Sequence, residues 1–292
     1  PQCRNFQGFT PLHFGCKLGG QDSIRFLVNK GADVNAKTYI QELTPLHVAC
    51  ECQQIQSVRV LIECGADVNM ATKDNWTPMH FASLNGNLPI VKELVQAGAS
   101  INCLTNTKDT PLHFACKCGS HLLVKYFLNM GAFPLAKDND GNTPLIIAAM
   151  VGPILSVQAF IDAHIKLDDV NSKRILFLFF IYQTALHQAV QNNHIQIVEL
   201  LLNNNANMHT VDVYMNSPME KAKIKGFDEV FNLLNQNEVK NARHRSRTTA
   251  IRNSGPISRS SNEFKNGPPK PLNNLTFANS NSIDTIPEAD EE

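Results

Sequence analysis

Apolar and polar positions along residues 4–237 follow a pattern that recurs about every 33 residues. Each unit opens with a Thr-Pro-Leu-His tetrapeptide or a variant of it, and a second apolar stretch with helical spacing follows, as at residues 90–95. The tetrapeptides begin at Thr10, Thr44, Thr77, Thr110, Thr143, Thr184 and Ser217, with spacings of 34, 33, 33, 33, 41 and 33 residues. A fixed period of this length is typical of a solenoid built from one repeated unit.

Each unit is predicted to form a turn followed by two antiparallel helices. Thr before Pro is typical of a helix start. The Thr side chain accepts a hydrogen bond from a free N–H group of the first turn, and proline has no N–H group that would need a partner there. Small residues five and six places after the Thr, such as Ala49 and Cys50, let the two helices approach closely. A glycine after the second helix, such as Gly65, adopts the left-handed conformation that ends a helix. Since one unit cannot bury its apolar face alone, neighbouring units must share one core.

The tetrapeptide, the paired small residues and the Gly-Ala-Asp-Val-Asn segments at 31–35 and 65–69 resemble the ankyrin repeat family. The resemblance covers about seven repeats and predicts that residues 1–237 form an ankyrin repeat domain. It implies an all-α solenoid in which each repeat contributes a β-turn or hairpin finger and two antiparallel helices. It also implies a structural role for the recurring histidine, which bridges backbone groups of adjacent turns. The histidines at this position are His13, His47, His80, His113 and His187.

One departure from the period precedes the sixth repeat, where eight extra residues coincide with the apolar segment 174–181. Deleting this segment leaves an ordinary repeat junction. Three interpretations remain open at this point. The segment is a translated short intron or another error in the gene model, a lengthened finger that binds something apolar, or a stretch folded back on the stack.

Residues 238–292 differ in character from the repeats. They are rich in Asn, Ser, Arg and Pro and poor in large apolar residues, so we predict a disordered C-terminal tail. Residues 240–259 carry six Lys and Arg and no acidic residue. Two arginines before Thr248 match the preference of a basophilic kinase, so Thr248 is a candidate phosphorylation site. The alternative is that this stretch is a solvated basic linker.

The composition of the chain argues against nucleic-acid binding and membrane insertion as default functions. The 26 Lys and Arg balance 26 Asp and Glu, so neither nucleic acid nor an anionic membrane is the default partner. The longest apolar run is eight residues, and about 20 are needed to span a membrane, so membrane insertion is not expected. No leader sequence is recognised at the start of the chain. We therefore expect the eight cysteines to be free thiols in a reducing compartment.

The sequence carries no pattern that indicates catalysis. Phosphate-binding glycine loops, a nucleophile elbow and a zinc-protease helix motif are all missing. Cys50 and Cys52, like Cys116 and Cys118, are separated by one residue and so would point to opposite faces of a helix instead of toward one metal ion. We expect no enzyme activity, no catalytic residues, no cofactor, no metal and no small-molecule substrate. Cys52 and Cys118 are expected to be more exposed than Cys50 and Cys116.

The resemblance implies that partners dock on the fingers and on the concave face, which is the side formed by the fingers and the first helix of each repeat. In the first three repeats, several of these positions hold large apolar side chains, with Trp76, the only tryptophan, as the expected anchor. The predicted partner-binding residues are Phe6, Phe9, Leu18, Ile40, Leu43, Trp76 and Leu84. In repeat 4 the equivalent positions are polar except for Cys118. The alternative is that these side chains pack on each other or on a repeat further upstream.

The sequence therefore predicts a monomeric cytoplasmic scaffold or adaptor that binds a partner protein, with the nucleus as the alternative location. A second hypothesis is that the chain is the ankyrin-repeat region of a larger signalling or membrane-attached protein, such as a channel or a kinase, with repeats or domains before Pro1. A third is a nuclear regulator that uses the basic segment 240–259, although the balanced charge makes nucleic acid the less favoured partner.

Overall fold

The computed structural model describes residues 2–170, 173–175, 179–181 and 183–253, which form fourteen α-helices and two short strands. The helices are α1 (Pro11–Leu18), α2 (Gln21–Asn29), α3 (Pro45–Glu51), α4 (Ile55–Glu63), α5 (Pro78–Leu84), α6 (Leu88–Gln96), α7 (Pro111–Lys117), α8 (His121–Asn129), α9 (Pro144–Val151), α10 (Ile154–Asp162), α11 (Ala185–Gln191), α12 (Ile195–Asn203), α13 (Pro218–Lys225) and α14 (Asp228–Asn253). The strands are β1 (Lys173–Ile175) and β2 (Phe179–Ile181). Residues 1–244 form one compact unit.

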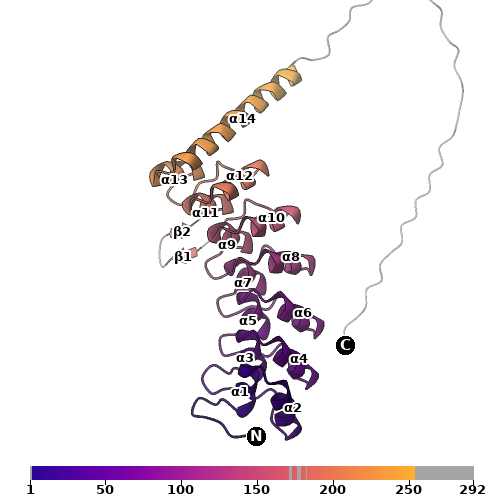
Figure 1. The fold of residues 1–292 in the computed structure, drawn as a ribbon. Helices are drawn as coiled ribbons and strands as arrows, with labels where there is room; N and C mark the ends of the chain where they lie inside the picture. The colour runs from indigo at the N-terminus through magenta and orange to yellow at the C-terminus, as the bar shows by residue number, and fades with distance from the viewer. Residues whose placement is uncertain (1, 171–172, 176–178, 182, 254–292) are drawn as a thin grey trace, which may run out of the picture. The chain divides into compact units, whose positions relative to one another are not determined.

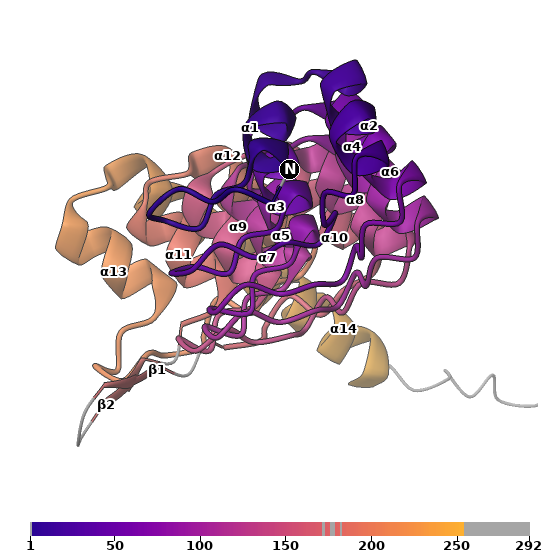
Figure 2. The same ribbon diagram turned by 90° about the horizontal axis from the view of Figure 1, so that it is seen from below.

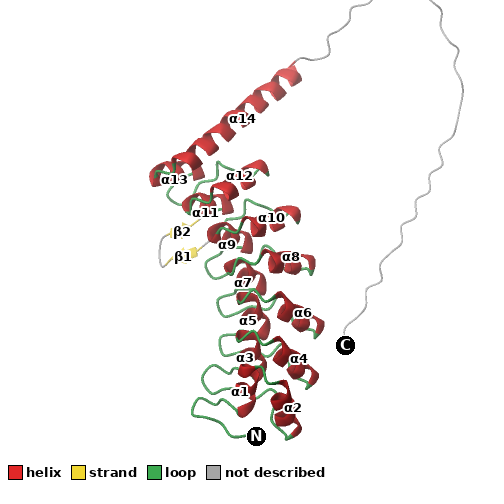
Figure 3. Cartoon of the chain, viewed as in Figure 1, coloured by secondary structure: helices red, strands yellow, loops and turns green. Residues whose placement is uncertain are grey.

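The helices of this unit are arranged in two rows (Figure 1). The first helix of every repeat packs on the first helix of the next, from α1 to α13, and the second helices α2 to α12 stack beside them. The loops that join successive repeats project from the edge of the first row as fingers (Figures 2 and 3). This arrangement is the all-α solenoid with two antiparallel helices per repeat that the sequence predicts. Within the described residues only one finger contains paired strands, and the others are closed by turns.

The core follows the repeat period. The third residue of the tetrapeptide is buried in repeats 1 to 6, from Leu12 to Leu186, and so is the small residue five places after the Thr in repeats 2 to 6. The second helices add aliphatic side chains such as Val58 and Val91, which have no exposed surface. These side chains belong to one hydrophobic cluster with members from every repeat, so the core is continuous along the stack.

The helix boundaries follow the predicted local chemistry. Pro45 occupies the first turn of α3, and the Thr44 hydroxyl accepts the His47 backbone N–H at 3.4 Å. The Thr44 N–H donates to His47 Nδ1 at 3.0 Å, so histidine completes the reciprocal capping contact that glutamate often makes. After α4, Gly65 takes a φ of 84°, which glycine adopts without steric cost.

The recurring histidines bridge neighbouring repeats, which confirms the role that the resemblance implies. In each ring Nδ1 accepts the N–H of the capping threonine, as in His47, so Nε2 carries the proton and donates it to a carbonyl of the following finger. The acceptors are Leu43 O for His13 (3.0 Å), Trp76 O for His47 (3.1 Å), Cys103 O for His80 (3.2 Å), Asn142 O for His113 (3.1 Å) and Asn216 O for His187 (3.3 Å).

Burial keeps these imidazoles neutral. Desolvation lowers the pKa of His47, His80 and His187 to about 4, and it lowers the pKa of His13 and His113 in the same direction. Protonation would place a hydrogen on Nδ1, and this atom would then no longer accept the N–H of the capping threonine, as it does in His47. The histidines are therefore structural parts of the frame.

The extra segment before repeat 6 forms a two-stranded antiparallel hairpin between α10 and α11. Lys173 pairs with Ile181, Arg174 with Phe180 and Ile175 with Phe179. The hairpin lies on the same side of the stack as the fingers (Figures 1 and 2). The backbone of its described part has the form of a lengthened finger, and binding of an apolar partner by this segment stays a prediction. Its tip, residues 176–178, lies outside the described residues.

The C-terminal helix differs from the prediction. The sequence predicted that a disordered tail begins at residue 238, but α14 continues without a break to Asn253. Val230 and Leu234 anchor its first turns in the core, and a helix that is already nucleated extends at low cost per added residue. Thr248, the predicted phosphorylation site, lies in this helix. The remainder of the predicted tail, residues 254–292, lies outside the described residues.

Candidate protein-binding surface

The structure divides the seven predicted partner-binding residues into exposed, half-buried and buried groups. Phe6 and Leu18 are exposed over 88% and 82% of their surfaces, and Ile40 and Leu84 are also exposed. Phe9 and Trp76 are half-buried. Phe9 packs on rings of its own repeat, with centroids 5.4 Å from His13 and 5.9 Å from Phe14, neither of which belongs to the predicted set.

The expectation that Leu43 faces solvent is wrong, because only 7% of its surface is exposed. Leu43 lies where the finger meets α3, and its backbone is held on both sides. Its N–H donates to Thr38 Oγ at 2.9 Å, and its carbonyl accepts from His13 Nε2 at 3.0 Å. The backbone is thus fixed between two repeats, and the side chain lies against protein, with only its edge reaching the surface.

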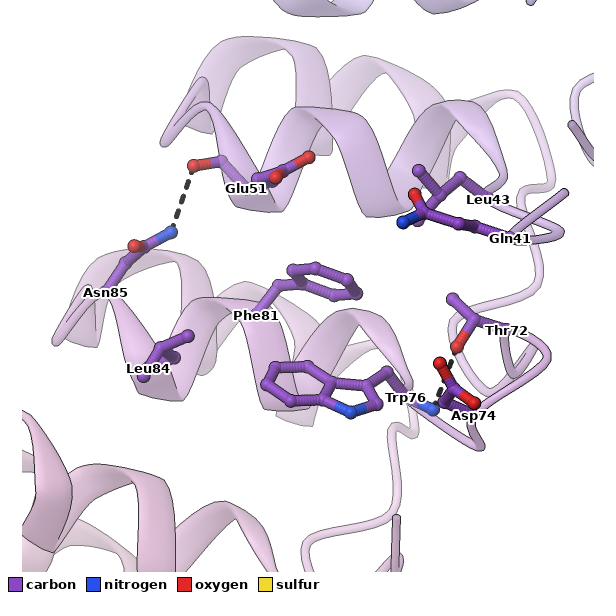
Figure 4. Close-up of a pocket in the computed structure, with 9 residues that line it drawn as sticks. All are labelled: Gln41, Leu43, Glu51, Thr72, Asp74, Trp76, Phe81, Leu84 and Asn85. Carbon is purple, nitrogen blue, oxygen red and sulfur yellow. Dashed lines mark hydrogen bonds between the residues drawn. The ribbon is translucent and has the colours of Figure 1, made fainter. Parts of the chain in front are cut away.

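A pocket of about 440 Å³ lies on the concave face between repeats 2 and 3 (Figure 4). Its nine lining residues are Gln41, Leu43, Glu51, Thr72, Asp74, Trp76, Phe81, Leu84 and Asn85. Three of these, Leu43, Trp76 and Leu84, are among the predicted binding residues, and the pocket brings them together. Phe6, Phe9, Leu18 and Ile40 do not line it. The predicted cluster is therefore a pocket in repeats 2 and 3 with separate exposed side chains in repeat 1 and in the finger of repeat 2.

Trp76 forms an aromatic wall whose position is fixed before any partner binds. Its ring centroid lies 5.1 Å from Phe81 and 4.6 Å from Phe114, separations at which aromatic rings attract each other. Its backbone N–H donates to Thr72 Oγ at 3.1 Å, and its carbonyl accepts from His47 Nε2 at 3.1 Å. Because the preceding repeat holds the backbone and the next repeat holds the ring, binding requires little reordering of this side chain.

Sequence reasoning missed Phe81 as a binding residue. Phe81 lies four residues after Thr77 on α5 and faces the pocket beside Trp76 (Figure 4). The signal was present in the repeat pattern, because the same position holds Phe14 in repeat 1 and Phe114 in repeat 4. The binding positions predicted from the sequence were those in the fingers and near the end of each first helix, and this position four residues after the threonine was not among them.

The polar part of the pocket is acidic. Glu51 at the end of α3 and Asp74 in the third finger are both exposed, and none of the nine lining residues is Lys, Arg or His. Two lysines of this region, Lys73 and Lys17, do not line the pocket. The positive charge of Lys73 interacts with Glu42, and that of Lys17 interacts with Cys52. Asn85 joins the two helices of the pocket, since its Nδ2 donates to the Cys50 and Glu51 carbonyls at 3.2 and 3.0 Å.

The cysteines have the exposures predicted from helix geometry. Cys50 and Cys116 are buried, whereas Cys52 is half-buried and Cys118 is exposed. Burial also raises the pKa of the Cys16 thiol to about 12, which disfavours the reactive thiolate. All eight cysteines lie in the described part of the chain and are free. Among the residues that the structure describes, no three His, Cys, Asp or Glu side chains gather as a metal site requires.

No helix within the described ranges combines the length and the apolar character needed to cross a bilayer.

Comparisons with known proteins agree with this architecture. A family model described as ankyrin repeats in three copies matches residues 37–105 and 84–174, and a single ankyrin repeat model matches residues 7–39 and 182–213. The crystal structure of the human ASB11 ankyrin repeat domain is similar in fold, with a TM-score of 0.65 and 23% sequence identity. The similarity covers 73% of this chain and 92% of that domain. No curated protein matches the sequence. Because the family models cover more than half of the residues, the chain belongs to the ankyrin repeat family.

Proposed function

We propose that the chain is a scaffold or adaptor that binds a partner protein on the concave face of repeats 1–3, with Trp76 as the anchor. Ankyrin repeats are generally protein-interaction modules, and the fold alone does not select a partner. The observation that carries the proposal is the pocket between repeats 2 and 3, where Leu43, Trp76, Phe81 and Leu84 line one hollow. We place this scaffold in the cytoplasm, because its free cysteines suit a reducing compartment.

The composition of the pocket is that of an interface hot spot. Such sites combine a well-packed aromatic or aliphatic centre with a polar rim that excludes water. Here the aromatic wall of Trp76 and Phe81 is bordered by Gln41, Glu51 and Asn85. Burying one large apolar side chain of a partner in this hollow contributes roughly 1.5–3 kcal/mol, or about a tenfold to hundredfold gain in affinity.

The test uses Leu84→Lys, which places in repeat 3 the residue type that repeat 4 has at the same position. Leu84 is exposed at the pocket, so the fold should persist, and circular dichroism checks this. The matched control is Leu155→Lys, which changes an exposed leucine of the second-row helix α10. Partners are captured from native lysate with the wild type and both variants, identified by mass spectrometry, purified and titrated.

We expect Leu84→Lys to weaken binding of the captured partner at least about tenfold, because it puts a charge into an apolar contact that must be desolvated. Leu155→Lys should bind as the wild type does. If both variants bind equally well, the pocket is not the docking site, and the proposal is wrong.

A further inference from the structure

We propose that the segment entering this pocket is a linear peptide that carries a large apolar side chain between lysine or arginine residues. The inference rests on the proposed function and adds the chemistry of the partner. Two features of the pocket carry it, namely its apolar centre and the position of its two carboxylates.

The centre of the pocket suits one or two apolar side chains. Its volume of about 440 Å³ falls within the range of cavities that enclose ligands. Trp76 and Phe81 lie in the middle of the hollow, between Asp74 of the finger and Glu51 at the end of α3 (Figure 4). Both rings are held by other rings of the stack, at 4.6 Å from Trp76 to Phe114 and 5.7 Å from Phe81 to His47. The hollow is thus preformed, and an apolar side chain gains contact without displacing protein.

The carboxylates lie on opposite sides of this centre. Asp74 comes from the third finger, whereas Glu51 comes from the end of α3, and Figure 4 shows Phe81 and Trp76 between them. With no cation among the nine lining residues, the pocket carries two formal negative charges. An apolar side chain in the centre therefore brings its neighbours on both sides toward a carboxylate. Lysine or arginine at those neighbouring positions gives charge-assisted hydrogen bonds, and acidic residues are repelled.

An extended segment fits this surface better than a compact ligand does. The backbones of the second and third fingers are hydrogen-bonded to each other, with the Lys73 N–H donating to the Gln41 carbonyl at 3.1 Å. The finger side of the pocket is therefore held in place. Ile40 precedes Gln41 in the same finger and is exposed, which continues the apolar surface beyond the pocket. A peptide can use both the hollow and this continuation, whereas a small molecule would use only the hollow.

The experiment selects binders from a phage-displayed library of random twelve-residue peptides on the full chain. The enriched peptides are then synthesised and titrated by following the fluorescence of Trp76, the only tryptophan. The charge variant is Glu51→Gln with Asp74→Asn. Its matched control is Glu199→Gln with Asp22→Asn, which removes the same charges from exposed positions on second-row helices. Leu84→Lys serves as the variant that blocks the pocket.

We expect the enriched peptides to share a large apolar residue flanked by lysine or arginine and to change the Trp76 emission on binding. The charge variant should lower their affinity about three- to tenfold, the control variant should leave it unchanged, and added salt should weaken wild-type binding more than binding to the charge variant.

The outcomes separate this inference from the proposed function. If the enriched peptides lack basic residues, or if they bind the charge variant as well as the wild type but lose binding to Leu84→Lys, the pocket binds a partner and the basic chemistry is wrong. If no peptide is enriched, a linear segment is not the occupant, and the captured partner protein still tests the proposed function. If binding is insensitive to both the charge variant and Leu84→Lys, both proposals fail.

Discussion

Two of the concave-face positions at which repeats 3 and 4 differ change from large apolar to charged. Repeat 3 has Trp76 before its capping threonine and Leu84 seven residues after it, whereas repeat 4 has Asp109 and Lys117 at the same places. In repeat 3 these side chains line the apolar pocket. In repeat 4, Lys117 Nζ lies 2.8 Å from Asp109 Oδ1 and 5.0 Å from the centre of the Phe114 ring, so the two polar residues are occupied with each other.

The frames beneath these surfaces are the same. Both repeats have a capping threonine followed by proline, a buried histidine that donates to the following finger, and a phenylalanine at the fourth position, Phe81 or Phe114. Even the aromatic contact is shared, because Trp76 of repeat 3 packs on Phe114 of repeat 4. Residues that recur with the repeat period therefore determine the backbone and the core. The residue before the capping threonine and the one seven places after it determine whether the surface is apolar, as with Trp76 and Leu84, or an ion pair, as with Asp109 and Lys117.

The largest expected effect is on the frame, where the two repeats should respond alike. Because burial lowers the pKa of His47, His80 and His187 to about 4 from an ordinary value near 6.5, the unfolded chain binds more protons than the folded chain between these values. Stability is therefore complete above about pH 6.5 and falls as pH drops toward 4. Each of these histidines should cost about 2 kcal/mol between pH 7 and pH 5. Urea unfolding followed by circular dichroism measures this loss.

Histidine variants show whether the frame is the source of this pH dependence. His80→Gln in repeat 3 and His113→Gln in repeat 4 should each reduce the slope of stability against pH, since each removes one buried proton-binding group. His209→Gln is the control, because His209 is exposed in the folded protein. A free energy of unfolding that stays constant between pH 7 and pH 5 would contradict the structural role of the histidines.

The next effect distinguishes the core of the pocket from its edge. Leu43→Ala should lower the free energy of unfolding by about 2–4 kcal/mol, because it truncates a side chain that is only 7% exposed and leaves a cavity. Leu84→Ala should cost less than about 1 kcal/mol, because 41% of Leu84 is exposed. Both variants are measured by urea unfolding at neutral pH. Equal losses would mean that the two leucines contribute alike to the core and that the pocket has no separate edge.

The parts of the fold that could be predicted from sequence are those set within one repeat or at a fixed distance along the period. Thr44 and Pro45 specify a helix start, Gly65 specifies a helix end, and the His47 bridge recurs with the tetrapeptide. Each of these features depends on residues at a constant separation along the chain, so the repeat period is enough to predict it. The exposure of Phe6, Leu18, Ile40 and Leu84 could also be predicted, because it depends only on their place within the repeat.

The parts that could not be predicted depend on how neighbouring repeats meet. Leu43 occupies a position expected to be exposed, yet the His13 bridge holds its backbone between two repeats, and its side chain is buried. Phe81 becomes a pocket residue only because Trp76 and the finger of repeat 2 leave a hollow beside it. The length of α14 was missed for another reason, since composition alone does not show that Val230 anchors the helix that follows.

The smallest expected effect concerns the ion pair that replaces the pocket in repeat 4. Asp109 is almost completely buried, and Thr107 Oγ donates to its Oδ2 at 2.8 Å, while Lys117 satisfies Oδ1. Lys117→Ala should therefore cost about 1–2 kcal/mol in urea unfolding, because a buried carboxylate oxygen loses its donor. Arg59→Ala is the matched control, since its pair with Glu93 joins more exposed partners and should contribute less than about 1 kcal/mol. If the two variants lose equal stability, Lys117 and Asp109 form only a surface pair, and the surface of repeat 4 is as free to accept a partner as that of repeat 3.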